Sequence, residues 1–214
     1  MAEGDLARDA TREVGAELRR LAELLADRDP PVELLQTIAE DLRAVGVRLT
    51  TAPRRARPYE TAVDAGDAAA EAQRRERSRA YHDELGPLRG VANPVAPPLR
   101  FGDAVRPGAV AATARLGALH EGPPRLVHGG WLAALFDEVL AVLQRDAGVD
   151  GATAELTVRF RRPTPVGAEL HFEGWIEQDL GRSVIARAEC RVDGQVVAEA
   201  EARFVRGALR RDPR

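Results

Sequence analysis

Residues 126–140 read "LVHGGWLAALFDEVL", and this stretch decides the fold of the chain around it. From Gly130 to Arg145, large apolar residues recur at spacings of three and four, the period of an α-helix with one buried face. That face consists of Leu132, Leu135, Phe136, Val139, Leu140 and Leu143. The opposite side carries small residues and one carboxylate, Asp137. We therefore expect a helix that packs on a sheet with one face and allows close approach of another molecule on the other.

The sequence period changes to two on both sides of this helix. Four segments after it alternate apolar and polar residues, and Asp193-Gly194 is typical of a tight hairpin turn between the last two. In the first segment the apolar phase is Ala154, Leu156, Val158 and Phe160. Two shorter strands, near residues 99–105 and 109–116, precede the helix. This order predicts an α+β fold, an antiparallel sheet wrapped around one central helix.

The N-terminal part of the chain has a different pattern. Leucine and isoleucine at helical spacing on both sides of "DRDPP" predict a helical hairpin over residues 1–50. Residues 51–85 have few large apolar side chains and predict a linker or weak helix. The sheet and its helix are assigned to residues 86–208, and residues 209–214 to a disordered tail. The apolar face of the hairpin must be buried, so we expect it to support a dimer or to act as a lid.

Composition excludes several classes of function. All 31 basic residues are arginine, which rules out Schiff-base chemistry and a Walker-type phosphate loop. A single cysteine, Cys190, rules out an internal disulfide and a cysteine-based zinc site. Residues 1–85 hold 14 arginines against 18 acidic residues, unlike a nucleic-acid binder. A charged N-terminus and the lack of an apolar run of about 20 residues predict a cytoplasmic protein that does not enter membranes.

The start of the central helix suits recognition of a carbonyl group. The first N–H groups of a helix lack intrahelical partners, and Gly129-Gly130 leaves them open to a ligand. Asp137 follows Gly130 by about 10 Å along the helix axis, so one small ligand cannot contact both on the same helix. Two such helices, antiparallel about a twofold axis, place Gly130 of one subunit beside Asp137 of the partner subunit. We therefore expect a homodimer with two equivalent sites.

The chemistry that this pairing favours is acyl transfer. Backbone donors aimed at a carbonyl oxygen stabilise the negative charge that develops on it. Asp137 would then attack the carbonyl carbon or deprotonate the attacking water, and the residues alone leave both roles open.

Two longer segments carry a family resemblance. The stretches "EGPPRLVHGGWLAALFDEVLA" (121–141) and "TAELTVRFRRPTPVGAELHFEGWIEQDLGRS" (153–183) resemble the hotdog-fold acyl-CoA thioesterases of the phenylacetic-acid-degradation (PaaI) type. The resemblance covers about residues 87–207. It implies a hotdog fold, in which a sheet wraps one helix, and active sites between paired subunits. It also implies cleavage of a thioester without a metal or an added cofactor, since CoA is part of the substrate.

The resemblance assigns roles to individual residues. The Gly129 and Gly130 N–H groups would polarise the thioester carbonyl, and His128 would shape the loop that presents them. The catalytic acid of the family falls on Asp137. Thr153 occupies the position of a hydroxyl that orients water near this acid.

The resemblance also indicates which residues would bind the CoA phosphates, and it shows one departure from the family. The resemblance places the phosphates near arginine-rich turns, where guanidinium groups match phosphate geometry. The residues so assigned are Arg161, Arg162, Gly181, Arg182 and Ser183. The chain departs from the family six residues before His128, where several members carry Asn or Gln and this sequence has Gly122. Glu121, the preceding residue, is the candidate to compensate.

Three functions fit these residues. The first is hydrolysis of a small-molecule acyl-CoA by a homodimer or a dimer of dimers. The second is hydrolysis of an acyl group on a carrier protein, which presents the same thioester. The third is a non-catalytic acyl-CoA sensor with DNA-binding helices in front, and both the acidic N-terminal part and the retained Asp137 argue against it.

Overall fold

The computed structural model describes residues 3–57, 68–149 and 151–207. The chain forms two compact units, Met1–Pro94 and Val95–Arg214. Residues 58–67 of the predicted linker and the predicted tail at 209–214 lie outside the described residues.

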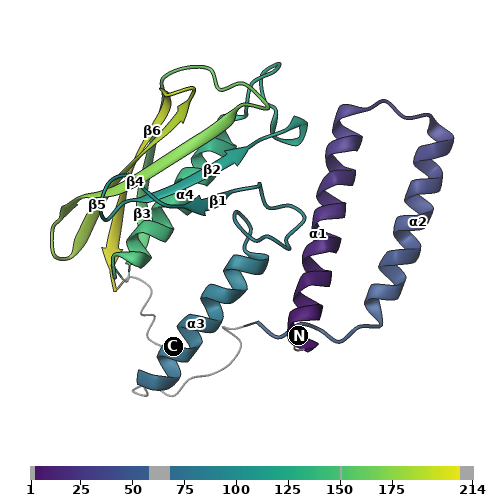
Figure 1. The fold of residues 1–214 in the computed structure, drawn as a ribbon, viewed down its shortest axis with the longest axis horizontal. Coiled ribbons are helices and arrows are strands. Elements are labelled where there is room, and N and C mark those ends of the chain that lie inside the picture. The colour runs from purple at the N-terminus through teal and green to yellow at the C-terminus, as the bar shows by residue number, and fades with distance from the viewer. Residues whose placement is uncertain (1–2, 58–67, 150, 208–214) are drawn as a thin grey trace. The chain divides into compact units, whose positions relative to one another are not determined.

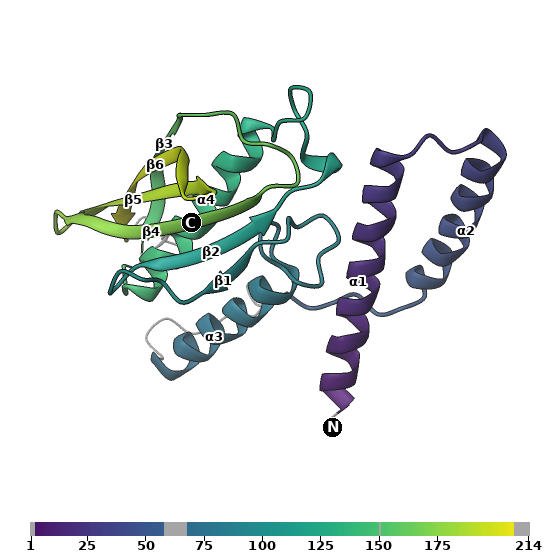
Figure 2. The ribbon, with the colours of Figure 1, turned by 45° about the horizontal axis from the view of Figure 1, so that its top comes forward.

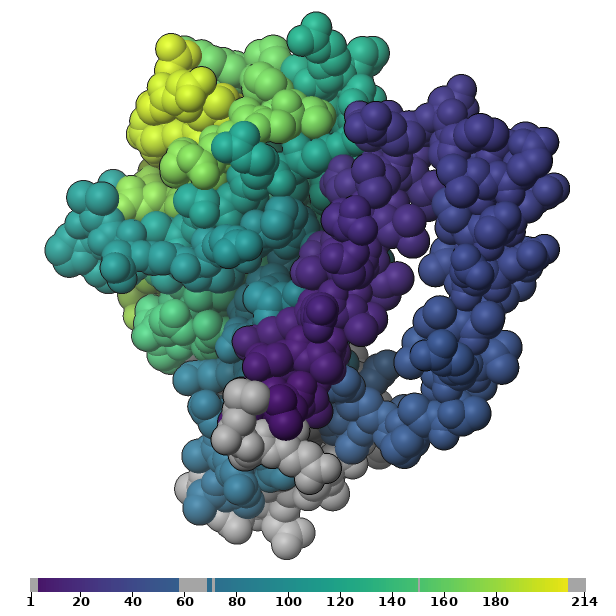
Figure 3. Space-filling view, turned by 45° about the vertical axis from the view of Figure 1, so that its right-hand side comes forward, coloured from purple at the N-terminus to yellow at the C-terminus, as the bar shows by residue number. Residues whose placement is uncertain are grey.

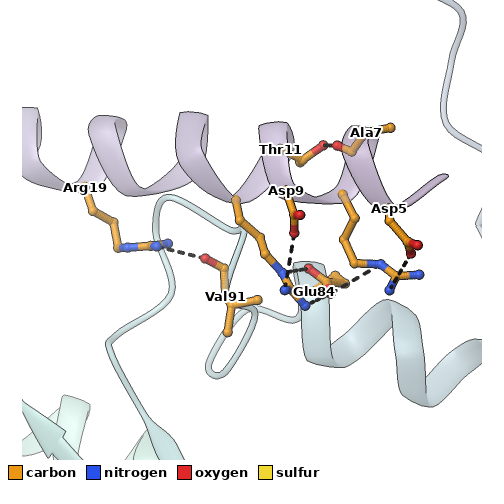
Figure 4. A network of polar contacts seen from close by, with 9 residues as sticks. Asp5, Ala7, Asp9, Thr11, Arg19, Glu84 and Val91 are labelled. Carbon is orange, nitrogen blue, oxygen red and sulfur yellow. Dashed lines mark hydrogen bonds and ion pairs between the residues drawn. The ribbon is translucent and has the colours of Figure 1, made fainter. Parts of the chain in front are cut away.

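The N-terminal unit is helical. Its helices are α1 (Glu3–Asp27), α2 (Val32–Thr50) and α3 (Ala68–Leu85). The first two lie on either side of the proline-containing turn (Figure 1). In the stretch predicted as a linker or weak helix, α3 occupies the second half. Arg19 Nη2 donates to the Val91 carbonyl over 2.8 Å and Arg12 forms an ion pair with Glu84, so α1 is tied to the end of α3 and the loop after it (Figure 4).

The second unit consists of one sheet and one long helix. Its elements are β1 (Arg100–Gly102), β2 (Val110–Arg115), the 3-10 turn η2 (Ala118–His120), α4 (Gly129–Asp146), β3 (Gly151–Phe160), β4 (Glu169–Asp179), β5 (Ser183–Val192) and β6 (Gln195–Arg206). The strand order is β1-β2-β4-β5-β6-β3, and every pair is antiparallel. The sheet wraps around α4, which contacts strands β2 to β6 (Figures 1 and 2). The predicted α+β architecture is confirmed.

The core lies between α4 and the sheet. All six residues of the predicted apolar face of α4 are at most 2% exposed. Phe136 from this face meets Phe172 of β4 edge to face, with ring centroids 5.2 Å apart. Burying a side chain of this size contributes about 1.5–3 kcal/mol, so this face provides the main attachment of the helix. The predicted hairpin turn is also confirmed, with positive φ at Asp193 (48°) and Gly194 (76°).

The alternation predicted for β3 is wrong at two of its four positions. Ala154 and Phe160 are exposed, whereas Leu156 and Val158 pack against the core. The cause at Ala154 is a β-bulge, because Thr153 pairs with Phe204 and Glu155 with the adjacent Arg203, which leaves Ala154 without a partner in this ladder. An extra residue of this kind re-aims its neighbours. As a result Thr153 lies on the side of the sheet that faces α4. Strict alternation from Leu156 would have placed it on the opposite side.

Candidate active site

His128 caps the N-terminus of α4 with its side chain. Its Nδ1 atom accepts a hydrogen bond from the Gly130 N–H over 3.0 Å, and its carbonyl accepts from Trp131 N–H over 3.0 Å. Nδ1 is therefore unprotonated, and in the neutral ring the proton is on Nε2. The two glycine amides are thus not equivalent. Gly130 N–H is engaged by the cap, while within the described residues the Gly129 N–H has no acceptor.

Phe160 packs over Gly129. A Cβ atom placed on Gly129 would lie 3.0 Å from Phe160 Cζ, a tight contact that the ring would have to relieve by a small shift. Phe160 is the last residue of β3 and is 56% exposed, which makes its ring part of the surface beside the Gly129 amide. Sequence reasoning placed it in the core by alternation. Its position at the end of an edge strand, directly before Arg161-Arg162-Pro163, was the signal for a residue at the mouth of a site.

Gly122 makes room for His128. A Cβ atom on Gly122 would lie 2.8 Å from His128 Cα and 2.9 Å from His128 Cβ, closer than real contacts allow. Glu121 is used in the same loop, where its Oε1 accepts from the Arg125 N–H over 2.8 Å. Arg125 itself has a positive φ of 63°. In this loop the backbone of His128 therefore occupies the space that a longer side chain at position 122 would need, and Glu121 holds the turn that leads to it.

Asp137 and Thr153 are brought together. The Thr153 hydroxyl donates to Asp137 Oδ1 over 3.2 Å, from the bulge in β3 to the face of α4 away from the core. Asp137 is half-buried and Thr153 is exposed. One carboxylate oxygen is oriented by this bond, and Oδ2 is left for a second donor.

The predicted site residues fall at two ends of the unit. At one end, the N–H groups of Arg161 and Arg162 both donate to the Val197 carbonyl, close to Phe160 and the start of α4. At the other end, Arg206 N–H donates to the Arg182 carbonyl. Ser183 pairs with Val205, and the adjacent residue Phe204 pairs with Thr153, so this end also carries Thr153. Val197 and Arg206 are nine residues apart on β6, which is about 30 Å. Within one subunit the two sets are therefore separated by most of the length of β6.

The predicted phosphate-binding arginines differ in their contacts. Arg161 Nη2 lies 2.7 Å from Glu199 Oε2, and this hydrogen bond raises the pKa of Arg161 and lowers that of Glu199. Arg162 Nη1 donates to the Val196 carbonyl over 2.8 Å. The side chain of Arg182 is exposed.

The loop between β4 and β5 is held by an ion pair. Arg206 Nη2 donates to Asp179 Oδ2 over 2.8 Å, and Gly181 N–H donates to Asp179 Oδ1 over 2.9 Å. The hydrogen bond from Arg206, and to a smaller extent the one from Gly181 N–H, lower the pKa of Asp179 to about 2. Gly181, with a φ of 75°, is thereby fixed next to Arg182 and Ser183.

Other kinds of site have no support among the described residues. In this part of the chain no three His, Cys, Asp or Glu side chains are grouped to hold a metal ion. No helix in the described ranges combines the length and apolar character needed to cross a membrane. The Cys190 thiol is buried in the core, and this burial raises its pKa to about 12, which disfavours a nucleophilic role.

Comparison with known proteins finds sequence similarity within the second unit. Residues 125–198 match the sequence model of the thioesterase superfamily. A stretch of 90 residues is 32% identical to the acyl-coenzyme A thioesterase THEM4 of Xenopus laevis, and it spans 40% of this chain and 40% of that protein. The chain thus covers less than half of the curated relative that it matches.

One of the similar solved structures superposes on most of this chain. The crystal structure of protein RHA08564, a thioesterase superfamily protein, is 29% identical and superposes with a TM-score of 0.75 over 91% of this chain and 94% of that one. That match includes residues of the N-terminal unit as well. A PaaI protein from Thermus thermophilus is 23% identical over 50% of this chain and 92% of that one, with a TM-score of 0.47. The sheet wrapped around α4 and the superposition on RHA08564 show a hotdog fold, and residues 125–198 within it match the thioesterase superfamily.

Proposed function

We propose that this protein hydrolyses acyl-CoA thioesters to a free acid and CoA, at two sites that are shared between the subunits of a homodimer. The observation that carries the proposal is the position of the two reactive groups on α4. The Gly129 amide and the Asp137–Thr153 pair lie eight residues apart, which is about 12 Å along the helix. An antiparallel pair of such helices joins the complementary halves of each site.

Each half has a distinct task in the proposed reaction. The thioester oxygen accepts a hydrogen bond from the Gly129 N–H at the positive end of the α4 dipole, because the Gly130 N–H is held by His128. Thr153 orients the carboxylate of Asp137 through Oδ1. His128 acts as a positioning residue, since its cap sets the direction of the first turn of α4.

The proposed chemistry needs no group beyond water and the carboxylate. Acting as a general base, Asp137 of the partner subunit takes a proton from water through Oδ2, and the water oxygen bonds to the carbonyl carbon. The carbon–sulfur bond then breaks, and the thiolate of CoA takes up the proton that Asp137 removed from water, which restores the carboxylate. Acting as a nucleophile, the same carboxylate would bond to the carbonyl carbon and expel the CoA thiolate, and water would then hydrolyse the mixed anhydride and restore the carboxylate. Both routes yield the same acid and the same thiol.

The proposed phosphate contacts follow the same division. Arg161 and Arg162 stand at the end that carries Gly129, and Arg182 with the Gly181–Ser183 turn stands at the end that carries Asp137. In a shared site the two sets would approach the CoA from different subunits. A carrier-protein substrate would place a protein surface at the same position, so the acyl-CoA and carrier-protein alternatives differ mainly in what these arginines contact.

The comparisons support the reaction class. The second unit has the fold and sequence of the thioesterase superfamily, and the relative from Xenopus laevis is named an acyl-coenzyme A thioesterase. The assignment to the PaaI type and to the cytoplasm, made from the sequence, belongs to the same proposal.

The test of the reaction is release of CoA from short, medium, long and aryl acyl-CoAs. We expect wild type to turn over some of them and Asp137→Asn to lose at least about a hundredfold in kcat/KM, as expected for a group that takes part in the chemical step. Asp146→Asn is the matched control, because it removes an exposed carboxylate from the end of the same helix. Binding without release by wild type would contradict hydrolysis and favour the sensor.

The shared site has a separate test. Asp137→Asn and Gly129→Val each remove one half of the site, because the valine side chain would crowd the Phe160 ring and the space beside the Gly129 amide. When the two inactive variants are mixed at equal amounts and allowed to exchange subunits, half of the dimers are mixed and each contains one intact site. About a quarter of wild-type activity should return. No recovery after demonstrated exchange would show that each site is built within one chain.

A further inference from the structure

The helix α2 has an apolar stripe that the described part of the chain leaves uncovered. None of its residues is buried, and Leu35, Leu42, Val45 and Leu49 are 38–66% exposed. By contrast, α1 is tied to the region of α3 by Arg12 and Arg19, and Figure 3 shows an open gap between α1 and α2. In proteins most of the stability of a helix comes from packing of its apolar face against another element. A stable α2 therefore requires a molecule that covers this stripe.

The stripe has the spacing of a coiled coil. Leu35, Ile38, Leu42, Val45 and Leu49 follow one another at intervals of three, four, three and four residues. These are the a and d positions of a heptad repeat, which form the seam between paired helices. On one side of the seam Ala39 and Gly46 occupy the e positions, where small side chains permit close approach of a second helix. On the other side Asp41 and Arg48 occupy the g positions.

The charges at the g positions select one antiparallel register. In an antiparallel pair an a residue faces a d residue, so Leu42 can face Ile38 or Val45 of a second α2. The first register sets Asp41 against the same carboxylate of the other helix, which is repulsive. The second sets Asp41 against Arg48 of the partner subunit twice, related by the twofold axis. It also sets Ala39 against Gly46 of the partner subunit on the other side of the seam.

The charge of the hairpin disfavours other occupants. Residues 3–50 contain 11 acidic residues and 7 arginines. This net negative charge repels anionic lipid surfaces and nucleic acid. A second copy of the chain offers an apolar stripe of the same period and the opposite charge at the facing position.

We infer that α2 is a pairing helix, which binds α2 of a second copy of this chain in antiparallel orientation with Leu42 against Val45 of the partner subunit. The contact is separate from the catalytic groups of α4. It goes beyond the proposed function, because it assigns the N-terminal unit a role in assembly whichever thioester the second unit cleaves.

Distances between spin labels on the full-length chain test the orientation and the register. Single cysteines replace Glu33, Glu40 or Val47 in a Cys190→Ala background, and all three sites lie on the outer side of the proposed pair. The inferred register centres the twofold axis between residues 43 and 44. With a rise of 1.5 Å per residue, axial separations are about 32 Å for labels at 33 and about 11 Å for labels at 40 and at 47. We therefore expect equal distances at 40 and 47 and a longer one at 33.

Each other arrangement gives a different pattern. The register with Leu42 against Ile38 centres the axis at residue 40, and would give equal distances at 33 and 47 with the shortest at 40. Parallel pairing would give similar distances at all three sites. Either pattern, or no distance between labels, would overturn the inference.

A charge exchange tests the ion pairs. Asp41→Arg places like charges at both facing positions and should abolish the label pattern, and Asp41→Arg combined with Arg48→Asp should restore it. Circular dichroism and CoA release of the same variants show whether each is folded. If the double variant is folded but does not restore the pattern, the inferred register is wrong. Because the label measurement uses no substrate, its outcome is independent of whether the thioesterase proposal holds.

Discussion

Thr153 donates a hydrogen bond to Asp137 across the gap between β3 and α4, with Oγ1 and Oδ1 3.2 Å apart. The bond exists because the bulge at Ala154 turns Thr153 towards the helix. It fixes one oxygen of a carboxylate that would otherwise rotate freely on a half-buried helix face. The relationship gives Thr153 a testable role that is separate from folding.

Thr153→Val keeps the shape of the side chain and removes the donor. A hydrogen bond to a charged group is worth about 1.5 kcal/mol or more, so we expect kcat to fall by roughly tenfold or more with little change in thermal stability. Thr153→Ser retains the hydroxyl, so its kcat should stay close to that of wild type. The measurement is kcat with the best acyl-CoA substrate. A wild-type kcat in the Thr153→Val variant would show that Thr153 does not orient Asp137 in the reaction.

His128→Ala removes the side-chain cap of α4 and leaves the Gly130 N–H without its acceptor. Loss of an N-cap costs about 1 kcal/mol, and we expect a decrease of this size in the free energy of unfolding measured in urea. His128→Asn supplies a carbonyl oxygen at the capping position and should recover most of the loss. If Ala and Asn variants are equally destabilised, the packing of the ring matters more than its hydrogen bond.

Gly122→Ala introduces a methyl group where His128 Cα and Cβ already lie. The loop must shift, so we expect CoA release to fall and the His128 cap to loosen. Gly102→Ala is the matched control, because no atom lies within 4 Å of a Cβ built there. Hydrogen exchange at the Gly130 amide reports the cap directly, and unchanged protection in the Gly122 variant would show that the loop adapts without moving His128.

The Asp179–Arg206 ion pair predicts a pH dependence of stability. The carboxyl pKa is lowered from 3.8 to about 2 in the folded protein. The contribution of the pair is therefore present above pH 3.8 and is lost as the pH falls towards 2. We expect Asp179→Asn to lower the Tm at pH 7 and to have a smaller effect near pH 2.5. A difference in Tm that is the same at both pH values would contradict this assignment.

Several features were accessible from the sequence because they depend on short-range periodicity. The buried face of α4 follows from spacings of three and four residues, and all six predicted residues are buried. The turn at Asp193-Gly194 follows from the backbone conformations that these two residues tolerate. Asp137 and the glycines at the helix start were identified from the same pattern. Thr153 was found only through family resemblance, since simple alternation places it on the wrong face.

The tertiary structure decided the features that depend on residues far apart in the chain. The pairing of β3 with β6 introduces the bulge at Ala154, and no local pattern in residues 151–160 marks it. The His128 side chain selects one of two adjacent amides through a hydrogen bond that requires the 121–128 loop to fold back. The strand length of β6 separates the predicted site residues into two ends. The sequence by itself determined which face of α4 is buried, because local periodicity sets it, whereas only the folded sheet decided which side of β3 is buried at Ala154 and Phe160 and which of the candidate site residues meet.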